Sequence, residues 1–421
     1  MKPRIFTYIT AMTVLAALAL PTRWGAEEQK QDPPHYTVTD LGTLGGTFSA
    51  AGGLSNSGWV EGFSTLPGDT AVRAFLWRDG VMTDLGTLGG PNSFAGWPPG
   101  ENGDAAGSAE TSTPDPLGED FCGFGTHLIC LPFLWRSGVM TPLPTLGGNN
   151  GSANEINELA QVAGHAENAT ADPTCTPPQV LQFRPVIWEK GEVHELPTFA
   201  GDPDGFANAI NDVGQAAGAS GNCTTPLLHA VLWQNGTATD LGNLGGTMAE
   251  AIDINNQGQV VGGSFLPGDT TFHAFLWQNG VMTDLGTLPG DVATGIGGIN
   301  SKGQVVGCSY DASGSPRAYL WQNGVMTDLN TLIPAGSPLF LLCALAPINS
   351  RGQIAGSALQ TSTGEVHAFL ATPVHSSESA TPAAQGATRE SPKVVLPENV
   401  RRLLQQRPLF GRFKPGLIRP Q

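Results

Sequence analysis

The sequence predicts an all-β fold, a seven-bladed β-propeller of four-stranded antiparallel blades, over residues 36–373. The first observation is a repeat: the segment HAFLWQNGVMTDLGTL, or a degenerate copy of it, occurs seven times. The second is that each unit of about 40–50 residues contains four short apolar runs, which is the strand count of a propeller blade. The copies contain Trp77, Trp135, Trp188, Trp233, Trp277 and Trp321, and a truncated last copy contains Phe369.

The fifth unit, residues 247–290, shows the four runs most clearly. Turn sequences rich in Asn and Gly separate the runs, as in antiparallel hairpins. The third run is apolar on both faces, so we expect it to be covered on both faces of its sheet. No segment of the repeat region has a helical period. The four runs end at Ile254, Gly262, Trp277 and Leu285.

The strand count also predicts how the ring closes. A fourth-strand sequence of the VMTDLG type ends six units, and a seventh copy, Tyr36–Gly42, stands alone before the first unit. The last unit stops after its third run, at Ala371. We therefore expect the N-terminal strand to complete the last blade, which removes the open edges of the sheets. The alternative is an open solenoid, in which the missing and surplus strands are a coincidence.

The first residues have the pattern of a secretory signal peptide, which we place at residues 1–25. Lys2 and Arg4 precede an uncharged run from Ile5 to Leu20, and this run is short for a membrane span. An uncleaved anchor is the alternative. We expect a mature chain without a membrane span that is secreted, periplasmic or at the cell surface.

The six cysteines agree with export, because disulfides persist in oxidising compartments. None lies in a CxxC pair, so the sequence predicts no metal site. One pair of cysteines belongs to a single loop, and the other four fall in pairs on neighbouring units. The expected disulfides are Cys122–Cys130, Cys175–Cys223 and Cys308–Cys343.

Residues 374–421 differ in composition from the repeats. They begin with a segment rich in Ser, Pro, Ala and Thr, which cannot bury enough apolar surface to fold, and end in a basic stretch. We expect a disordered linker and basic tail. The whole chain carries a net charge of −16 although both of its ends are basic, so the repeat region is strongly acidic. This charge argues against nucleic acid as a partner, because phosphate would be repelled.

The triplets His273-Ala274-Phe275 and His367-Ala368-Phe369, with the LW, DLGTLGG and INxxGQVVG motifs, resemble the HAF family of probable extracellular repeats. The resemblance covers about residues 36–373. It implies export and a β-rich repeat array, and it implies no reaction. Five of the seven units depart from the triplet, so a catalytic ring of histidines is not expected.

A carboxylate recurs near the end of six of the seven fourth strands. It could be a ring of cation ligands or a repeated acceptor for backbone N–H groups of the next turn, and its repetition favours the acceptor. Asp253 begins a D-x-N-x-x-G segment that resembles a calcium loop, but no acid follows at its end, which favours a hairpin turn. The recurring carboxylates are Asp40, Asp84, Glu195, Asp240, Asp284 and Asp328.

The sequence contains no familiar catalytic motif, and we predict no catalytic residue and no cofactor. We expect an exported binding or scaffolding module whose partner is a protein or a carbohydrate at the cell surface or outside the cell. The alternative is a secreted polysaccharide hydrolase or lyase with its site in the axial channel, which a carboxylate pair that breaks the repeat would favour. The candidates for ligand binding are Trp97, Asp104, Glu155 and Asp253.

The connection between the second and third runs differs among the units. It is short in units one and five, and long in units two and three, at about Ala109–Leu131 and Ala166–Arg184; in unit four it carries Cys223. Equivalent connections lie on one face of the ring, so these three should be adjacent. Binding residues gather on loops held by a rigid scaffold, and disulfides make loops rigid. We expect the recognition surface here; the alternative is that insertions are merely tolerated.

Overall fold

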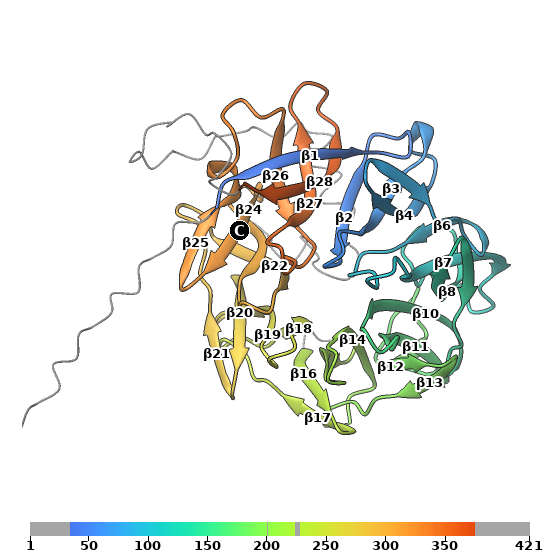
Figure 1. Ribbon diagram of the computed structural model, residues 1–421. Helices are drawn as coiled ribbons and strands as arrows, with labels where there is room; N and C mark the ends of the chain where they lie inside the picture. The colour runs from blue at the N-terminus through green and yellow to red at the C-terminus, as the bar shows by residue number, and fades with distance from the viewer. Residues whose placement is uncertain (1–33, 200, 224–227, 375–421) are drawn as a thin grey trace, which may run out of the picture. The chain divides into compact units, whose positions relative to one another are not determined.

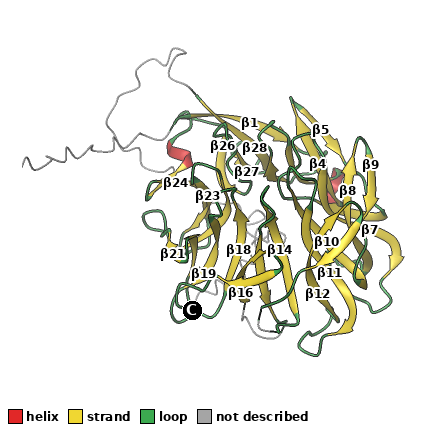
Figure 2. Cartoon of the chain, turned by 60° about the horizontal axis from the view of Figure 1, so that its bottom comes forward, coloured by secondary structure: helices red, strands yellow, loops and turns green. Residues whose placement is uncertain are grey.

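The computed structural model describes residues 34–199, 201–223 and 228–374. The predicted signal peptide, and the predicted tail beyond Val374, lie outside the described residues. Within them the chain forms seven four-stranded antiparallel sheets arranged around an axis as a β-propeller, as the repeat predicts (Figure 1). Strands account for nearly all of the regular structure, as Figure 2 shows. No helix in the described part is long and apolar enough to cross a membrane.

The first six blades each contain four consecutive strands, and blade 7 takes its fourth strand from the N-terminus. Blades 1 to 3 consist of β2 (Ser49–Leu54), β3 (Val60–Thr65), β4 (Val72–Arg78), β5 (Val81–Asp84); β6 (Gly89–Phe94), β7 (Ala105–Pro114), β8 (Leu128–Arg136), β9 (Val139–Pro142); and β10 (Gly147–Ile156), β11 (Val162–Ala171), β12 (Leu181–Glu189), β13 (Glu192–Glu195). Blades 4 and 5 consist of β14 (Asp204–Ile210), β15 (Ala216–Gly221), β16 (Leu228–Gln234), β17 (Thr237–Asp240); and β18 (Ala249–Ile254), β19 (Val260–Phe265), β20 (Phe272–Gln278), β21 (Val281–Asp284). Blades 6 and 7 consist of β22 (Ala293–Ile299), β23 (Val305–Tyr310), β24 (Pro316–Gln322), β25 (Val325–Asp328); and β26 (Leu339–Ala344), β27 (Ile354–Gln360), β28 (Val366–Pro373), β1 (Tyr36–Gly42). Two 3-10 turns, η1 (Pro67–Asp69) and η2 (Leu329–Thr331), complete the described elements.

The first strand of each unit lies innermost, and the fourth lies outermost. In blade 5 every residue of β19 is buried, whereas Val281 on β21 is 63% exposed. The inner strand β18 carries a bulge between Ala251 and Asp253. A Cβ atom on Gly262 of β19 would lie 2.0 Å from the backbone oxygen of Glu250. The glycine of the VVG motif is therefore needed for the close approach of the inner strand.

The repeated tryptophans pack blade against blade, as expected for large aromatic side chains in a core. Trp188 and Trp233 are 1% and 2% exposed. Each donates from its indole Nε1 to a backbone oxygen at the end of the preceding blade, Pro144 at 2.8 Å and Pro197 at 2.7 Å. Trp277 in blade 5 packs in the same way against the apolar cluster of blade 4. These rings stabilise contacts between blades rather than presenting a surface to a ligand.

The ring closes through β1, as the strand count predicts. β1 pairs antiparallel with β28, with Tyr36 opposite Pro373 and Asp40 opposite Phe369. Figure 1 shows this blue strand lying against the orange blade formed by β26, β27 and β28. A contact between side chains fastens the pair, because Nδ1 of His367 lies 2.9 Å from both carboxylate oxygens of Asp40.

Removing β1 should lower the melting temperature. A chain that begins at residue 44 lacks the fourth strand of blade 7 and leaves β28 as an open edge. We expect it to melt at least ~5 °C below a chain that begins at Pro34, because a loss of a few kcal/mol moves the melting temperature by about 2 °C per kcal/mol in a large domain. Circular dichroism measures both chains, and equal melting curves would contradict closure by this strand.

The contact between His367 and Asp40 should make closure pH-dependent. The hydrogen bond with Asp40, opposed by burial, raises the pKa of His367 above its ordinary value. Burial acts to raise the pKa of Asp40, but hydrogen bonds from His367 and Gly42 bring it below its ordinary value. Glu365, 3.5 Å from Nε2 of the same histidine, also favours the protonated ring. The stabilisation is complete between the ordinary aspartate pKa of about 3.9 and the ordinary histidine pKa of about 6.5, and it is lost as the pH rises through the raised pKa of His367.

We therefore expect His367→Gln to lower the melting temperature at pH 6 by more than at pH 9. His273→Gln is the matched control, because His273 contacts Asp284 at 2.9 Å between two consecutive strands of blade 5. Its loss should destabilise the protein less, since ring closure does not depend on it. If His367→Gln lowers the melting temperature by the same amount at both pH values, this explanation is wrong.

Candidate functional site

A pocket of about 280 Å³ lies at the axis, where the turns after the first strands of all seven blades meet. Its wall is repetitive, because most blades contribute an Ile or Leu followed by an Asn or Ser. Asparagine side chains on these turns bridge neighbouring blades through Nδ2. The acceptors are the backbone oxygens of the equivalent residues: Asn157 to Asn211, Asn211 to Asn255 and Asn255 to Asn300 at 3.0 Å, and Asn349 to Ser55 at 3.1 Å.

Two of the four sequence candidates, Glu155 and Asp253, lie in the wall of this axial pocket. They occupy a position where the other blades have Gly, Ala or Pro, so they break the repeat. Each accepts a backbone N–H from the following blade: Ile210 donates to Glu155 at 3.0 Å, and Ile299 donates to Asp253 at 2.7 Å. Both carboxylates therefore hold neighbouring blades together.

Three further carboxylates make the axial pocket acidic. Glu101, Glu158 and Asp212 line it, and no Lys or Arg does so within the described residues. Burial, together with the charges of Glu101 and Asp212, raises the pKa of Glu158. Glu101 accepts backbone N–H groups of Asn56 at 2.8 Å and Ser57 at 2.6 Å, again across a blade boundary. The negative pocket disfavours anionic ligands.

The other two candidates, Trp97 and Asp104, lie outside the pocket wall. Asp104 forms an ion pair with Arg136 at 2.7 Å. The equivalent positions of blade 5 are occupied by Gln259 and Gln278, which form a hydrogen bond. Trp97 is 5% exposed and its backbone oxygen packs against blade 1, so its ring offers little surface to a ligand. The structure thus brings Glu155 and Asp253 to one pocket and places the other two elsewhere.

The recurring carboxylates of the fourth strands are acceptors for backbone N–H groups, as their repetition predicts. Asp84, Asp240 and Asp284 each accept the N–H of the residue two positions on, at 2.7–2.8 Å. Five of the six recurring carboxylates also contact a basic side chain on the third strand, a second partner that sequence reasoning missed. The contacts are Arg73–Asp84, Arg184–Glu195, His273–Asp284, Arg317–Asp328 and His367–Asp40.

The long connections of blades 2 and 3 are mostly extended hairpins. β7 continues to Pro114 and β8 begins at Leu128, while β11 continues to Ala171 and β12 begins at Leu181. The predicted loop boundaries, Ala109–Leu131 and Ala166–Arg184, are therefore wrong, because strand ends such as AETSTP are polar and lack apolar alternation. We call the true loops and the adjoining end of β15, which are residues 115–127, 172–180 and 221–223, the cap.

The three disulfides join the cysteines as predicted, with Cα atoms 4.6–6.2 Å apart. Cys122–Cys130 fastens the cap loop of blade 2 to β8. Cys175–Cys223 links the cap segments of blades 3 and 4, so the cap crosses a blade boundary covalently. Cys308–Cys343 links blades 6 and 7.

Buried carboxylates lie beneath the cap. Glu119, which is fully buried, accepts the backbone N–H groups of Val180 at 2.7 Å and Leu181 at 2.8 Å and so joins the loops of blades 2 and 3. Nδ2 of Asn150 donates to Glu167 at 3.0 Å. Burial, reinforced by the charge of Glu119, raises the pKa of Glu167 to about 7. Sequence reasoning missed this network, because only the packing of two blades buries these side chains.

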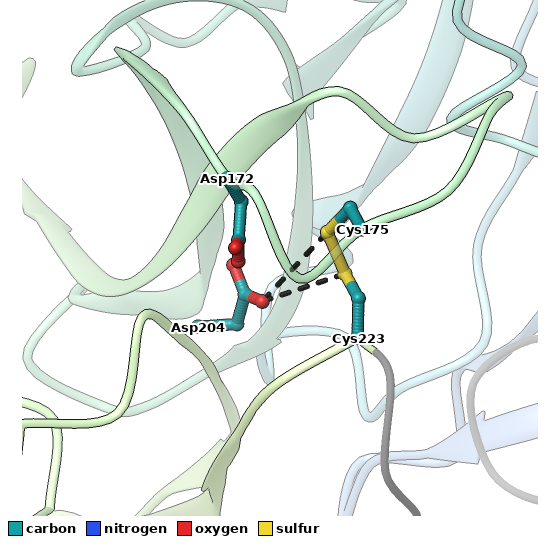
Figure 3. Close-up of side chains that lie close together, drawn as sticks. All are labelled: Asp172, Cys175, Asp204 and Cys223. Carbon is teal, nitrogen blue, oxygen red and sulfur yellow. Dashed lines mark hydrogen bonds between the residues drawn. A yellow bond between two sulfur atoms is a disulfide. The ribbon is translucent and has the colours of Figure 1, made fainter.

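Figure 3 shows a second cluster, formed by Asp172, Cys175 and Cys223 of the cap and by Asp204 at the start of β14. Oδ2 of Asp204 lies 3.5 Å from Sγ of Cys223 and 4.0 Å from Sγ of Cys175. Asp172 and Asp204 are 4% and 2% exposed. Burial and then the hydrogen bond with the adjacent Asp172 raise the pKa of Asp204 to about 8.

Comparison with known proteins adds little beyond the fold. No family model matches the chain, and no curated protein matches it. Acylaminoacyl peptidase from Pyrococcus horikoshii is 12% identical with a TM-score of 0.42, over 64% of this chain and 42% of that chain. The chain thus spans less than half of that peptidase.

Two further solved structures resemble the chain at a similar level. The β-propeller domain of the Trilobed protease from Pyrococcus furiosus is 10% identical with a TM-score of 0.40, over 65% of this chain and 79% of that chain. TolB from Acinetobacter baumannii is 13% identical with a TM-score of 0.38, over 72% and 76%. At these values the likeness carries no inference about ligand or activity.

The buried Glu167 should make the protein less stable as the pH rises. Its pKa is about 7 in the folded protein against 4.5 ordinarily, so its contribution is complete below pH 4.5 and is lost as the pH rises through 7. We expect Glu167→Gln, which stays neutral, to flatten the fall in melting temperature between pH 5 and pH 8. The exposed Glu192→Gln is the control and should leave the fall unchanged. An identical pH profile for Glu167→Gln and the native protein would overturn the assignment.

Proposed function

We propose that this protein is an exported, non-catalytic binding module, and that the cap of blades 2 to 4 is its recognition surface. The resemblance to the HAF family and the three disulfides support export, since disulfides persist in oxidising compartments. The acidic repeat region argues against nucleic acid as the ligand.

The observation that carries the proposal is the cross-linking of the cap. The Cys175–Cys223 disulfide and the bonds of Glu119 to Val180 and Leu181 combine segments from three blades into one surface. Ordering loops on binding costs conformational entropy, so a surface that is already rigid loses less free energy when a ligand arrives. Tolerated insertions would require no such contacts between them.

The exposed residues of the cap indicate a neutral ligand. Leu117 is 48% exposed, and the exposed positions around it are mainly Pro, Gly and Thr, including Pro116, Thr176, Pro177 and Pro178. His127 is the one ionisable side chain that is exposed in the described cap. A surface with few exposed charges on an otherwise acidic protein suits a neutral carbohydrate or an apolar segment of a protein.

The axial channel is the alternative site, as a polysaccharide hydrolase or lyase would use it. Glu155 and Asp253 break the repeat there, which is the feature that favours an enzyme. Each is held by a backbone N–H of the next blade, and most blades contribute the same Ile-Asn or Leu-Ser pair to the wall, which favours a structural role for the axis.

Two variants separate these functions. Leu117→Arg/Thr176→Arg alters the cap at exposed positions, whereas Glu155→Gln/Asp253→Asn alters the axis. Affinity electrophoresis against neutral plant, fungal and bacterial polysaccharides measures retention, and release of new reducing ends measures cleavage. We expect retention without cleavage, weakened at least about tenfold by the cap variant alone, as when a central contact is lost. Retention unchanged in the cap variant, or cleavage abolished by the axial variant, would overturn the proposal.

A protein ligand is tested separately. A photo-cross-linking residue at Leu117 should form adducts with surface proteins of the native host, whereas one at the exposed Val281 of blade 5 should not. Equal adducts at both positions would show that the cap is not selective.

A further inference from the structure

The cluster formed by Asp172, Cys175, Asp204 and Cys223 combines two carboxylates and two sulfur atoms on the boundary between blades 3 and 4 (Figure 3). We propose that, when a dithiol reduces the Cys175–Cys223 disulfide, these four side chains bind one zinc ion. The proposal concerns a state of the cap and does not depend on the ligand that the cap recognises.

The distances fit a four-coordinate site. One donor atom from each side chain lies within 4.8 Å of all the others. Two thiolates and two carboxylates are ligands that zinc accepts, usually in tetrahedral geometry with bonds of about 2.0–2.3 Å. Breaking the disulfide lets the two sulfur atoms separate to tetrahedral spacing. Sequence reasoning predicted no metal site because the four residues span 172–223 without a CxxC pair.

The carboxylates are oriented for this role. The backbone N–H of Thr174 donates to Oδ1 of Asp172 at 2.7 Å, and that of Phe183 donates to Oδ1 of Asp204 at 3.1 Å. Oδ2 of Asp204 remains directed at the sulfur atoms. Oδ2 of Asp172 is buried and accepts no hydrogen bond from any described N–H or hydroxyl group. Hydrogen bonds of this kind fix the ligands of metal sites and are their usual second layer.

The cysteines should stay together after reduction. The backbone N–H of Cys223 donates to Oγ1 of Thr174 at 3.2 Å, so the two cap segments are joined by more than the disulfide. Asp204 begins β14 and Asp172 follows β11 directly, so both carboxylates are attached to strands. Reduction therefore leaves four donors close together.

Reduction of the disulfide and binding of zinc conserve electrons and protons. The dithiol donates two electrons, the S–S bond breaks, Cys175 and Cys223 become thiols, and the dithiol closes to a cyclic disulfide. Zinc then binds both sulfur atoms as thiolates and both carboxyl groups as carboxylates, so the two thiol protons and any carboxyl proton leave to the buffer.

Exposure makes this disulfide the accessible one. Cys223 is exposed and Cys175 is partly exposed, whereas Cys308 and Cys343 are each 2% exposed, and the partly exposed Cys122 is bonded to the fully buried Cys130. Brief treatment of the folded full chain with a dithiol should therefore reduce Cys175–Cys223 first. Alkylation and mass spectrometry identify the thiols that form.

Cobalt(II) is the spectroscopic probe for zinc. After removal of the dithiol under nitrogen, we expect the reduced protein to bind one cobalt ion with a thiolate-to-metal charge-transfer band and the visible bands of four-coordinate cobalt, which zinc abolishes. The oxidised protein should show neither. Asp172→Asn/Asp204→Asn keeps all six cysteines and should bind at least about tenfold more weakly.

Matched controls locate the site. Cys122→Ser/Cys130→Ser removes another disulfide and should retain the cobalt spectrum, whereas Cys175→Ser/Cys223→Ser should lose it. Circular dichroism confirms that each variant is folded, and zinc should raise the melting temperature of the reduced native chain in a way that the aspartate variant does not show. Absence of the cobalt bands in the reduced chain, or an unchanged affinity in the aspartate variant, would overturn the proposal.

Discussion

Pairing of β1 with β28 is the contact on which the rest of the ring depends. Each blade buries its apolar side chains against two neighbours, and blade 7 presents a complete sheet to blade 1 only when the N-terminal strand has joined it. At the axis, Nδ2 of Asn349 donates to the backbone oxygen of Ser55 and so connects blades 7 and 1 a second time. Closure at the outer strand and closure at the axis therefore stabilise the same boundary.

Repetition and departure from it have different physical meanings in this chain. Positions that recur, such as the buried tryptophans, supply contacts and hydrogen bonds that every boundary between two blades needs. Glu155 and Asp253 depart from the repeat but also connect neighbouring blades, because each carboxylate accepts a backbone N–H of the next blade. The departure that has no such explanation is the cap, where three neighbouring blades carry segments that contact one another.

Much of the fold could be predicted because strands, turns and closure are encoded locally in each unit. The pairing of third-strand basic side chains with fourth-strand acids was missed, although the sequence holds a signal for it: Arg73 and Asp84, or His273 and Asp284, stand 11 residues apart, and unit two replaces both partners with Leu131 and Pro142. The loop boundaries and the buried acids could not be predicted. The ends of β7 and β11 are polar, and Glu119 is buried only because a loop of another blade covers it.

The chemistry of the cap follows from how it is held. Burying a carboxylate costs free energy unless it accepts hydrogen bonds or keeps a proton. Both occur here: Glu119 of the cap accepts two backbone N–H groups, while Glu167 of the adjoining β11 retains a proton up to about pH 7. An apolar contact of the same size would often be at least as stable. It would not fix the position of one loop against another, because apolar contacts are not directional. Directional bonds and a disulfide across a blade boundary supply the fixed geometry that a recognition surface requires.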